Sequence, residues 1–249
     1  MGGAIARRLA STREDLSVTV CETSAAVRES LCLVKGLAVT ESLVDVGGCD
    51  VLIAAVKPPT VRRVLEQAAS LSIGTVVSVA AGIPLRLVEA WSGKASARVM
   101  PNTPSLIGEG MSVVSFGGMV SEDQRSVVLS IFEAMGQVLE LPESSFDAAT
   151  ALSGAGPAYV YLLIEALVDA GCAQGLTRLD ARQLVTTTFT GAAAMVQQST
   201  EHTAVLRDMV TSPGGVTIEA VGVLEKLGLR GILWEAVEKA ADKSSQMAQ

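Results

Sequence analysis

The strongest constraint on the fold is residues 50–56 (DVLIAAV), which are apolar at almost every position. Such runs are typical of parallel strands buried on both faces. Strand and helix signals alternate up to residue 142. We expect strands at 18–22, 50–56, 75–79, 97–100, 111–116 and 137–141, and helices at 24–35, 60–71, from near Pro84, and at 122–135. This alternation predicts an α/β fold with a doubly wound parallel sheet, the class that binds dinucleotides at the carboxyl ends of its strands.

The second part of the chain shows no strand pattern. Its helical segments are expected at residues 157–173, 178–198, 204–210, 217–227 and 230–247. We therefore predict a dinucleotide-binding, Rossmann-type domain of residues 1–143 and an all-helical domain of residues 144–249. The helices are rich in Ala, Leu and Val but poor in charge, so they are either buried all round or packed against another subunit. We expect at least an obligate dimer.

Composition excludes several classes of function. Hydrophobic residues make up 49% of the 249 residues and charged ones 18%, yet no uninterrupted apolar run reaches the ~18 residues of a membrane span. Residues 1–9 lack the apolar core of a signal peptide. The net charge of −7, without blocks of like charge, argues against a nucleic-acid surface. The four cysteines lack CxxC spacing and the single histidine, His202, lacks partner ligands, so we expect free thiols in a cytoplasmic protein and no metal site.

Residues 1–9 (MGGAIARRL) have the pattern of the end of a glycine-rich loop and the helix that follows it. A dinucleotide fold normally begins with a strand and a complete G-x-G-x-x-G loop. Either this fold starts with a helix, or the sequence starts about a dozen residues late within that motif. Glu22 ends the first expected strand, where an acidic residue usually holds ribose hydroxyls. An ordinary exposed acid at a strand end is the alternative.

Three further motifs each have a functional and a structural interpretation. Lys57 and Pro58 end a buried strand, either at the ligand crevice or in an ordinary turn. In RVMPNTP (98–104), two prolines fix the backbone around Asn102, which marks either a binding loop or a rigid surface turn. In SGAGP (153–157), paired glycines permit close approach of either a ligand or a second backbone segment.

Residues 211–217 (TSPGGVT) lead directly into a predicted helix. Glycines beside a helix N-terminus expose backbone N–H groups, and the helix dipole adds positive potential, which together favour a carboxylate or phosphate. Ser212 and Thr217 can add hydroxyl donors. A simple N-cap would need only one Ser or Thr and no glycine pair.

In this order, these segments resemble the pyrroline-5-carboxylate reductase family. The matching stretches are AVKP (55–58), VAAG (79–82), MPNTP (100–104), LSGAGPAY (152–159) and TSPGGVT (211–217), the last followed by IEAVGVLE (218–225). The resemblance implies a Rossmann domain and a helical domain that interlocks in a homodimer, with dimers often assembled into rings. It also implies a cytoplasmic oxidoreductase of proline biosynthesis, which reduces 1-pyrroline-5-carboxylate to L-proline by hydride transfer from NADPH, with NADH possible.

The resemblance also implies the site residues. Those expected to bind the cofactor are Met1, Gly2, Val56, Lys57, Pro58, Ala80, Ala81 and Asn102. Those expected to bind the substrate are Ser212, Gly214, Gly215, Val216 and Thr217. Thr217 is the implied catalytic residue and would donate a hydrogen bond to the ring nitrogen. Only Met1 and Gly2 remain of the family's G-x-G-x-M-G loop, which bears on cofactor affinity. A protonated imine is already electrophilic, so no catalytic His or Cys is required.

Two rival functions stay open at this point. A 3-hydroxyacid dehydrogenase-like enzyme would need a buried Lys or His relay, for which the second part offers only Lys226, Lys239 and Lys243. A non-catalytic remnant or scaffold with a damaged cofactor site is the other rival. Cofactor preference is also open from the residues. Glu22 favours the free 2′-hydroxyl of NADH, whereas Thr23, Ser24 and Arg28 can hold a 2′-phosphate, and the resembling family more often uses NADPH.

Overall fold

The computed structural model describes residues 1–247. The chain forms two compact units. The first comprises Met1–Pro157 together with the end of the chain from Lys239, and the second comprises Ala158–Glu238. Secondary structure changes from strands to helices at η3 (Glu143–Ser145), next to the expected domain limit at residues 143 and 144. The domain limit expected from the sequence coincides with this change in secondary structure. The boundary between the two compact units lies later in the chain, because it depends on which residues pack together.

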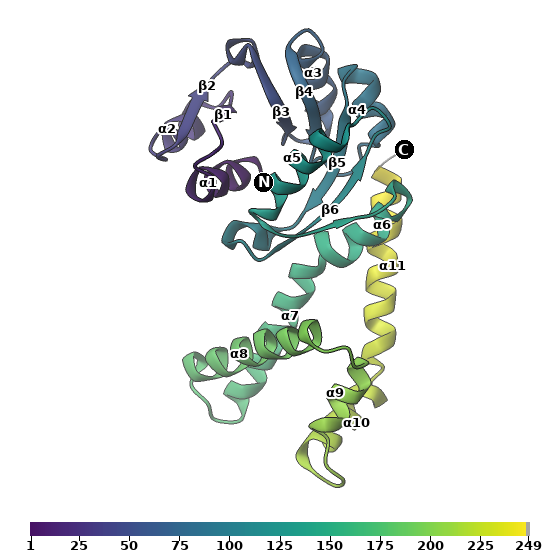
Figure 1. Cartoon of the computed structure of the whole chain (residues 1–249). Helices are drawn as coiled ribbons and strands as arrows, with labels where there is room; N and C mark the ends of the chain where they lie inside the picture. The colour runs from purple at the N-terminus through teal and green to yellow at the C-terminus, as the bar shows by residue number, and fades with distance from the viewer. Residues whose placement is uncertain (248–249) are drawn as a thin grey trace. The chain divides into compact units, whose positions relative to one another are not determined.

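The first unit alternates strands and helices, as the sequence predicts. Its elements up to the last strand are α1 Gly2–Thr12, β1 Val18–Cys21, α2 Ala25–Cys32, β2 Leu37–Thr40, η1 Leu43–Val46, β3 Gly48–Ala54, α3 Pro58–Ala68, β4 Ser72–Ser78, α4 Leu85–Ser92, β5 Ser96–Pro101, η2 Thr103–Ile107, β6 Gly110–Phe116, α5 Glu122–Glu133 and β7 Gly136–Glu140 (Figure 1). After η3, two short helical segments follow, α6 Phe146–Ala149 and η4 Thr150–Gly154. Strand β2, η1 and these last segments were absent from the sequence prediction.

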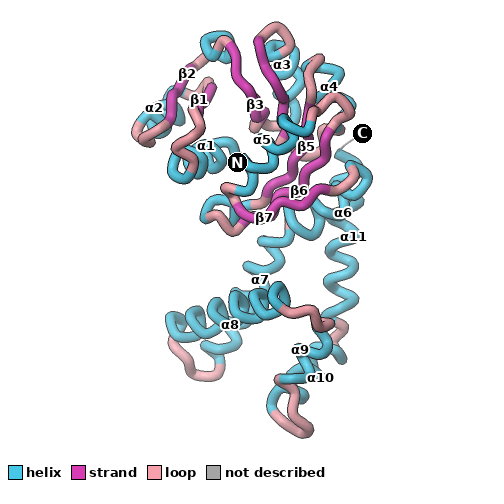
Figure 2. Tube along the Cα trace, viewed as in Figure 1, coloured by secondary structure: helices cyan, strands magenta, loops and turns pink. Residues whose placement is uncertain are grey.

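The strands form two sheets. One contains β1 and β2 in parallel, and the other has the order β3-β4-β5-β6-β7 (Figure 2). The two sheets are separate: among residues 1–247, no strand lies between β1 and β3 and pairs with both of them. One pair departs from the expected parallel arrangement, because β6 runs antiparallel to β5. The connection between them is only η2 and the left-handed Gly108 (φ +82°), and a short connection without a crossover helix returns the chain antiparallel.

Helices cover both faces of the larger sheet, which is the doubly wound arrangement. One core cluster joins α1 and α5 to strand residues such as Val77, Val99 and Val114. The other joins α3 and α4 to Ala54 and Val76 from the opposite face. Fully burying one such Val or Leu side chain contributes about 1.5–3 kcal/mol. The predicted fold class is therefore confirmed for this unit.

Local sequence signals explain where the helices begin. Pro58 and Pro59 occupy the first two positions of α3, where a missing N–H costs nothing, so the helix begins before the expected residue 60. Ser121 and Gln124 form a reciprocal capping box at the start of α5. Gly93 ends α4 in the left-handed conformation (φ +62°).

The second unit is helical, as predicted. It contains α8 Arg178–Gln198, α9 Thr203–Met209 and α10 Val216–Lys226, with most of α7 (Gly156–Ala173) and the first part of α11 (Leu229–Met247). Within residues 158–238, all of which the structure describes, Val168 and Ala181 are the only buried residues. Large apolar side chains stay exposed along the helices, among them Tyr161, Leu162, Leu179, Leu184, Met195 and Trp234.

One helical stretch, Glu143–Ala173, is long and apolar enough to cross a membrane by length and composition alone. It is not an uninterrupted apolar run. Glu165 and Asp169 lie within it, and a charged side chain at the centre of a bilayer costs about 2.5–3.5 kcal/mol. A partner subunit is therefore a better cover for this surface than lipid.

His202, Cys21 and Cys32 are exposed, whereas Cys49 and Cys172 are partly buried. His202 is exposed and caps α9, with its Nδ1 accepting the backbone N–H of Ala204 at 3.2 Å. The four cysteines are free thiols. Burial raises the pKa of the Cys49 thiol, and the neighbouring carboxylate of Asp50 adds to this effect.

Candidate active site

The predicted cofactor residues gather at the carboxyl ends of β3 and β4. These strands are paired with Ala54 opposite Ser78, and the N–H of Val79 donates to the carbonyl of Ala54 at 3.3 Å. The segments that follow the two strands, 56–58 and 80–81, therefore leave the sheet side by side. Val56 and Lys57 are exposed, and Ala80 is buried.

The N-terminus of α1 lies at the same edge. A Cβ atom on Gly2 would come within 2.9 Å of the Cβ of Ala55, so the helix start approaches the segment after β3 more closely than a larger residue would allow. Among residues 1–247, no side chain caps α1, whose N-cap is Met1. Its first backbone N–H groups could therefore bind an anion such as a pyrophosphate. The residues present therefore fit a dinucleotide.

Asn102 lies where β5 ends and η2 begins. Its Nδ2 donates to the carbonyl oxygen of Ser153 at 3.2 Å and lies 3.4 Å from the Ser153 hydroxyl, while its Oδ1 accepts the N–H of Met111 at 3.0 Å. The amide thus ties the turn between β5 and β6 to η4. This engagement supports the structural interpretation of the motif, and a place beside the nicotinamide stays a prediction.

The glycines at 154 and 156 have different surroundings. A Cβ on Gly154 would lie 2.9 Å from the Cε atom of Met100, so this glycine packs against a side-chain end and not against a second backbone. Gly156 has no atom within 4 Å of such a Cβ position. Close packing within the first unit therefore accounts for Gly154 alone.

An ion pair that was not predicted from the sequence connects β5, the start of α4 and η3. Arg98 on β5 is 6% exposed, and its Nη1 donates to Glu143 Oε1 at 2.8 Å. The same carboxylate oxygen accepts the N–H of Leu85 at the start of α4, at 2.6 Å. The guanidinium also lies 4.6 Å from the ring centre of Phe146. The signal available in the sequence was an arginine inside an apolar strand, but nothing there identified its partner.

The segment after β1 holds the residues expected to contact the adenosine ribose. Glu22 Oε1 accepts the N–H of Ser24 at 2.8 Å. Arg28 Nη1 donates to the carbonyl oxygens of Glu22 and Thr23 at 2.9 and 2.8 Å. Arg28 Nη2 also pairs with Glu41 Oε2 at 3.0 Å. The loop is therefore held by its own acid and by one arginine from α2.

The predicted anion site lies in the second unit, at the start of α10. Gly215 is the N-cap residue, and no side chain caps the helix. Gly214 has a φ of +65°, which strongly favours glycine, and a Cβ on Gly215 would come within 2.3 Å of the Ser212 hydroxyl. The N–H of Gly215 donates to the Ser212 carbonyl at 3.1 Å, closing a tight turn. Together these features leave a compact loop beside an open helix N-terminus.

Two residues of this loop differ in exposure. Val216 is 89% exposed, whereas Thr217 is half-buried in the first turn of α10. No side-chain hydrogen bond from the Thr217 hydroxyl is present in the part of the chain that the structure describes. The cofactor residues and this loop belong to different compact units. No group of three or more His, Cys, Asp or Glu side chains suited to a metal occurs among residues 1–247.

Comparison with known proteins gives consistent matches over both parts of the chain. Residues 143–247 match the family described as pyrroline-5-carboxylate reductase dimerisation, and residues 1–82 match NADP oxidoreductase coenzyme F420-dependent. The chain is 47% identical over 203 residues to pyrroline-5-carboxylate reductase of Arabidopsis thaliana, covering 80% of this chain and 74% of that protein.

Solved structures give the same result. The crystal structure of Plasmodium falciparum pyrroline carboxylate reductase with NADP bound is similar with a TM-score of 0.85 and 33% identity, covering 100% of this chain and 95% of that one. A pyrroline-5-carboxylate reductase from Coxiella burnetii gives a TM-score of 0.89 at 30% identity, covering 100% and 94%.

Proposed function

Because this chain belongs to the pyrroline-5-carboxylate reductase family, we propose that its 211–217 loop binds the substrate carboxylate and that Thr217 donates a hydrogen bond to the ring nitrogen. The chain is an oxidoreductase that reduces 1-pyrroline-5-carboxylate to L-proline, the last step of proline biosynthesis. Its cofactor is NADPH, with NADH as a second possibility. The family predicted from the sequence is confirmed.

The observation that carries the proposal is the loop before α10. Gly214 has a φ of +65°, which strains any other residue, and a Cβ on Gly215 would require the Ser212 hydroxyl to move. Among the described residues, no side chain caps the helix N-terminus that they border. A carboxylate placed there would accept backbone N–H groups and meet the positive end of the helix dipole. This interaction would fix the orientation of the imine ring, which is the main task left to the protein.

The remaining chemistry needs little from the protein. When bound, NADPH supplies the hydride that adds to the imine carbon. Thr217 lies in the first turn of the same helix, so a ring whose carboxylate binds at the helix start would present its nitrogen to that hydroxyl. As hydride adds to the carbon, the C=N bond becomes a C–N single bond and a lone pair develops on the nitrogen, to which the Thr217 hydroxyl would donate its hydrogen bond. No group with a shifted pKa is needed for this step.

For the cofactor, we propose that the uncapped start of α1 binds the pyrophosphate, next to Met1 and Gly2. Val56, Lys57, Pro58, Ala80 and Ala81 would line the bound nucleotide at the carboxyl ends of β3 and β4. Close approach of α1 to Ala55 and the pairing of Ala54 with Ser78 support this grouping. Asn102 would act by holding the β5–β6 turn in place beside it.

The rival functions are less well supported. Lys226, Lys239 and Lys243 are all exposed, so none has the buried setting of a dehydrogenase relay. An inert scaffold would have no need for an uncapped helix start beside two strand ends or for a glycine pair at a second one. We further propose that the protein is cytoplasmic and forms a homodimer through residues 143–247, with rings of dimers as a higher assembly.

The test is oxidation of NADPH and of NADH by the purified protein on addition of 1-pyrroline-5-carboxylate, followed by absorbance, with L-proline identified as product. We expect imine-dependent oxidation with both cofactors and a higher kcat/KM with NADPH. A folded protein that binds NADPH but oxidises none of it would favour the scaffold. Oxidation with a 3-hydroxyacid and NADP, and none with the imine, would favour the dehydrogenase.

A further inference from the structure

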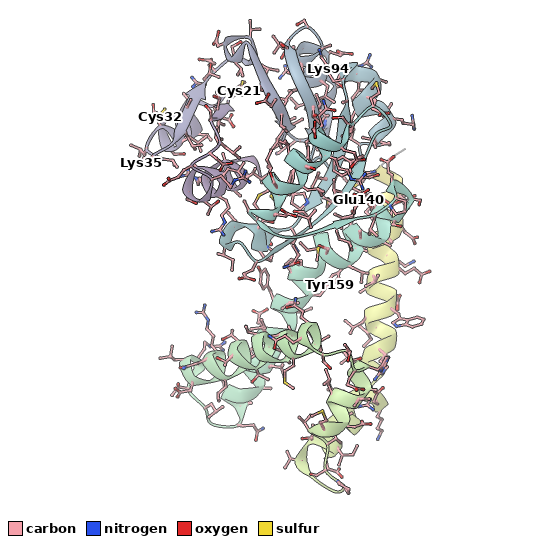
Figure 3. All side chains as sticks on the ribbon, in the orientation of Figure 1. Cys21, Cys32, Lys35, Lys94, Glu140 and Tyr159 are labelled. Carbon is pink, nitrogen blue, oxygen red and sulfur yellow. The ribbon has the colours of Figure 1, made fainter. Side chains whose placement is uncertain are left out.

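The end of the small β1–β2 sheet carries an excess of negative charge. Glu22 follows β1, Glu41 follows β2, and Asp45 lies in η1, whereas Arg28 is the cation that contacts this group. Burial raises the pKa of the Cys21 thiol at the end of β1, and the charges of Glu22 and Asp45 raise it further. Cys21 is labelled in Figure 3, as are Cys32 at the end of α2 and Lys35 after it. A bound phosphate would meet repulsion here unless Arg28 offsets it.

Arg28 is held by the backbone of the loop, whereas its partner Glu41 is mostly exposed. Two backbone carbonyls, those of Glu22 and Thr23, hold its Nη1, and its side chain is 21% exposed. Glu41 contacts the guanidinium through Nη2 alone and is 70% exposed. An anion that arrives at this guanidinium would therefore displace Glu41, because Arg28 is held by the loop.

We propose that Arg28 binds the 2′-phosphate of NADPH and that Glu41, by pairing with the same guanidinium, sets how strongly the site prefers NADPH over NADH. This inference rests on the proposed function, since it assumes that the nucleotide's ribose lies at the end of β1. The phosphate of NADPH must displace Glu41. The 2′-hydroxyl of NADH does not need to displace Glu41, because it can donate a hydrogen bond to the Glu22 carboxylate. Glu41 therefore weakens NADPH binding and leaves NADH binding unchanged.

The chain offers a matched control for the charge itself. Asp45 lies at the same end of the sheet but accepts a hydrogen bond from the Thr40 hydroxyl at 3.1 Å and does not contact Arg28. The substitution Asp45→Asn removes one negative charge from the same region without releasing the arginine. A comparison of Glu41→Gln with Asp45→Asn therefore distinguishes competition for Arg28 from the effect of negative charge in this region on phosphate binding.

The experiment measures dissociation constants for NADPH, NADH and 2′,5′-ADP by fluorescence titration and calorimetry, without substrate. We expect Glu41→Gln to tighten NADPH and 2′,5′-ADP by about two- to fivefold, the range of an exposed ion pair. NADH affinity should stay the same within error, and Asp45→Asn should change NADPH affinity by less than half as much. In an Arg28→Gln background, Glu41→Gln should have no effect on NADPH.

Three results would overturn the inference. Equal tightening of NADPH and NADH by Glu41→Gln would exclude a role for the 2′ position. Equal effects of Glu41→Gln and Asp45→Asn would leave only a general charge effect. A Glu41→Gln effect that persists without Arg28 would exclude competition for the guanidinium. Each differs from failure of the proposed function, in which the wild-type protein binds neither cofactor or oxidises none with the imine.

Discussion

Thr217 is the residue on which the proposed chemistry depends most directly. Its hydroxyl lies in the first turn of α10, half-buried and adjacent to the open helix start. We expect Thr217→Ala to lower kcat for 1-pyrroline-5-carboxylate by roughly one to three orders of magnitude, the range for one positioned donor. Steady-state kinetics with saturating NADPH measures this effect. Thr217→Ser keeps the hydroxyl and should retain most of the activity, while NADPH affinity should be the same in both variants. An unchanged kcat in Thr217→Ala would remove this residue from the mechanism.

The same loop contains a residue whose backbone conformation can be tested. Gly214 has a φ of +65°, and an L-residue in the left-handed region costs about 1–2 kcal/mol. We expect Gly214→Ala to raise KM for the imine several-fold, because the strained turn would no longer present the helix N–H groups to the carboxylate. Gly222→Ala, inside α10 and with open space around it, is the control and should leave KM unchanged. Equal KM values for the two variants would contradict the carboxylate site.

Single residues differ in how far the sequence reveals their role. The conformation of the 211–217 loop was predictable, because glycine, proline and hydroxyl side chains have few uses beside a helix start, while its role in binding the substrate stays a prediction. The contact between Arg28 and Glu41 was not, because it depends on the pairing of β1 with β2. The second of these strands was not predicted. The Arg98–Glu143 pair was not predicted either, because its two residues come from elements far apart in the chain.

At the scale of elements, Glu143 connects three of them. Its carboxylate accepts from Arg98 on β5 and from the N–H of Leu85 at the start of α4, and it begins η3. Removing it leaves a buried guanidinium without its counterion, which costs about 3–5 kcal/mol for a fully buried pair. Glu143 is 32% exposed, so we expect Glu143→Ala to lower the free energy of unfolding by about 2–3 kcal/mol. Urea denaturation measures the change.

The exposed pair Arg62–Glu66 is the comparison for this prediction. Its two side chains are 67% and 51% exposed and lie one turn apart on α3. Exposed pairs of this kind contribute about 0.3–0.5 kcal/mol, so Glu66→Ala should scarcely change the denaturation midpoint. If Glu143→Ala were equally mild, the Arg98 guanidinium would be stabilised mainly by the Phe146 ring, and the buried pair would have no special role.

Elements with long apolar runs or clear caps were predicted to within a few residues, and short ones were missed. β3 and β4 contain apolar runs, while α3 begins with two prolines and α5 with a capping box, which fix the starts of these helices locally. β2 is only Leu37–Thr40 and exists because it pairs with β1. The direction of β6 also depends on its connection and not on its own residues. Local pattern therefore specifies an element, whereas tertiary pairing specifies its direction and the shortest strands.

At the scale of the whole molecule, the second unit buries very little of its apolar surface within a single copy of the chain. Only two residues within 158–238 are buried, and many of its large apolar side chains face solvent. Monomeric proteins rarely expose apolar patches of this extent. Residues 143–247 match a dimerisation family. We therefore expect a dimer or a ring of dimers in light scattering at micromolar concentration, with no detectable folded monomer.

A charge placed on this surface should separate the copies. Leu184 on α8 is 57% exposed in the single chain, and so is Met119 in the first unit. Burying an unpaired carboxylate in an apolar interface costs several kcal/mol, so Leu184→Glu should yield monomer or unfolded protein and lose imine-dependent activity. Met119→Glu introduces the same charge at a side chain of equal exposure outside the dimerisation match, and it should leave mass and activity unchanged. A Leu184→Glu protein of wild-type mass would mean that α8 lies outside the interface. The apolar side chains of the other helices, such as Trp234 on α11 with 81% of its surface exposed, would then have to provide the contact between subunits.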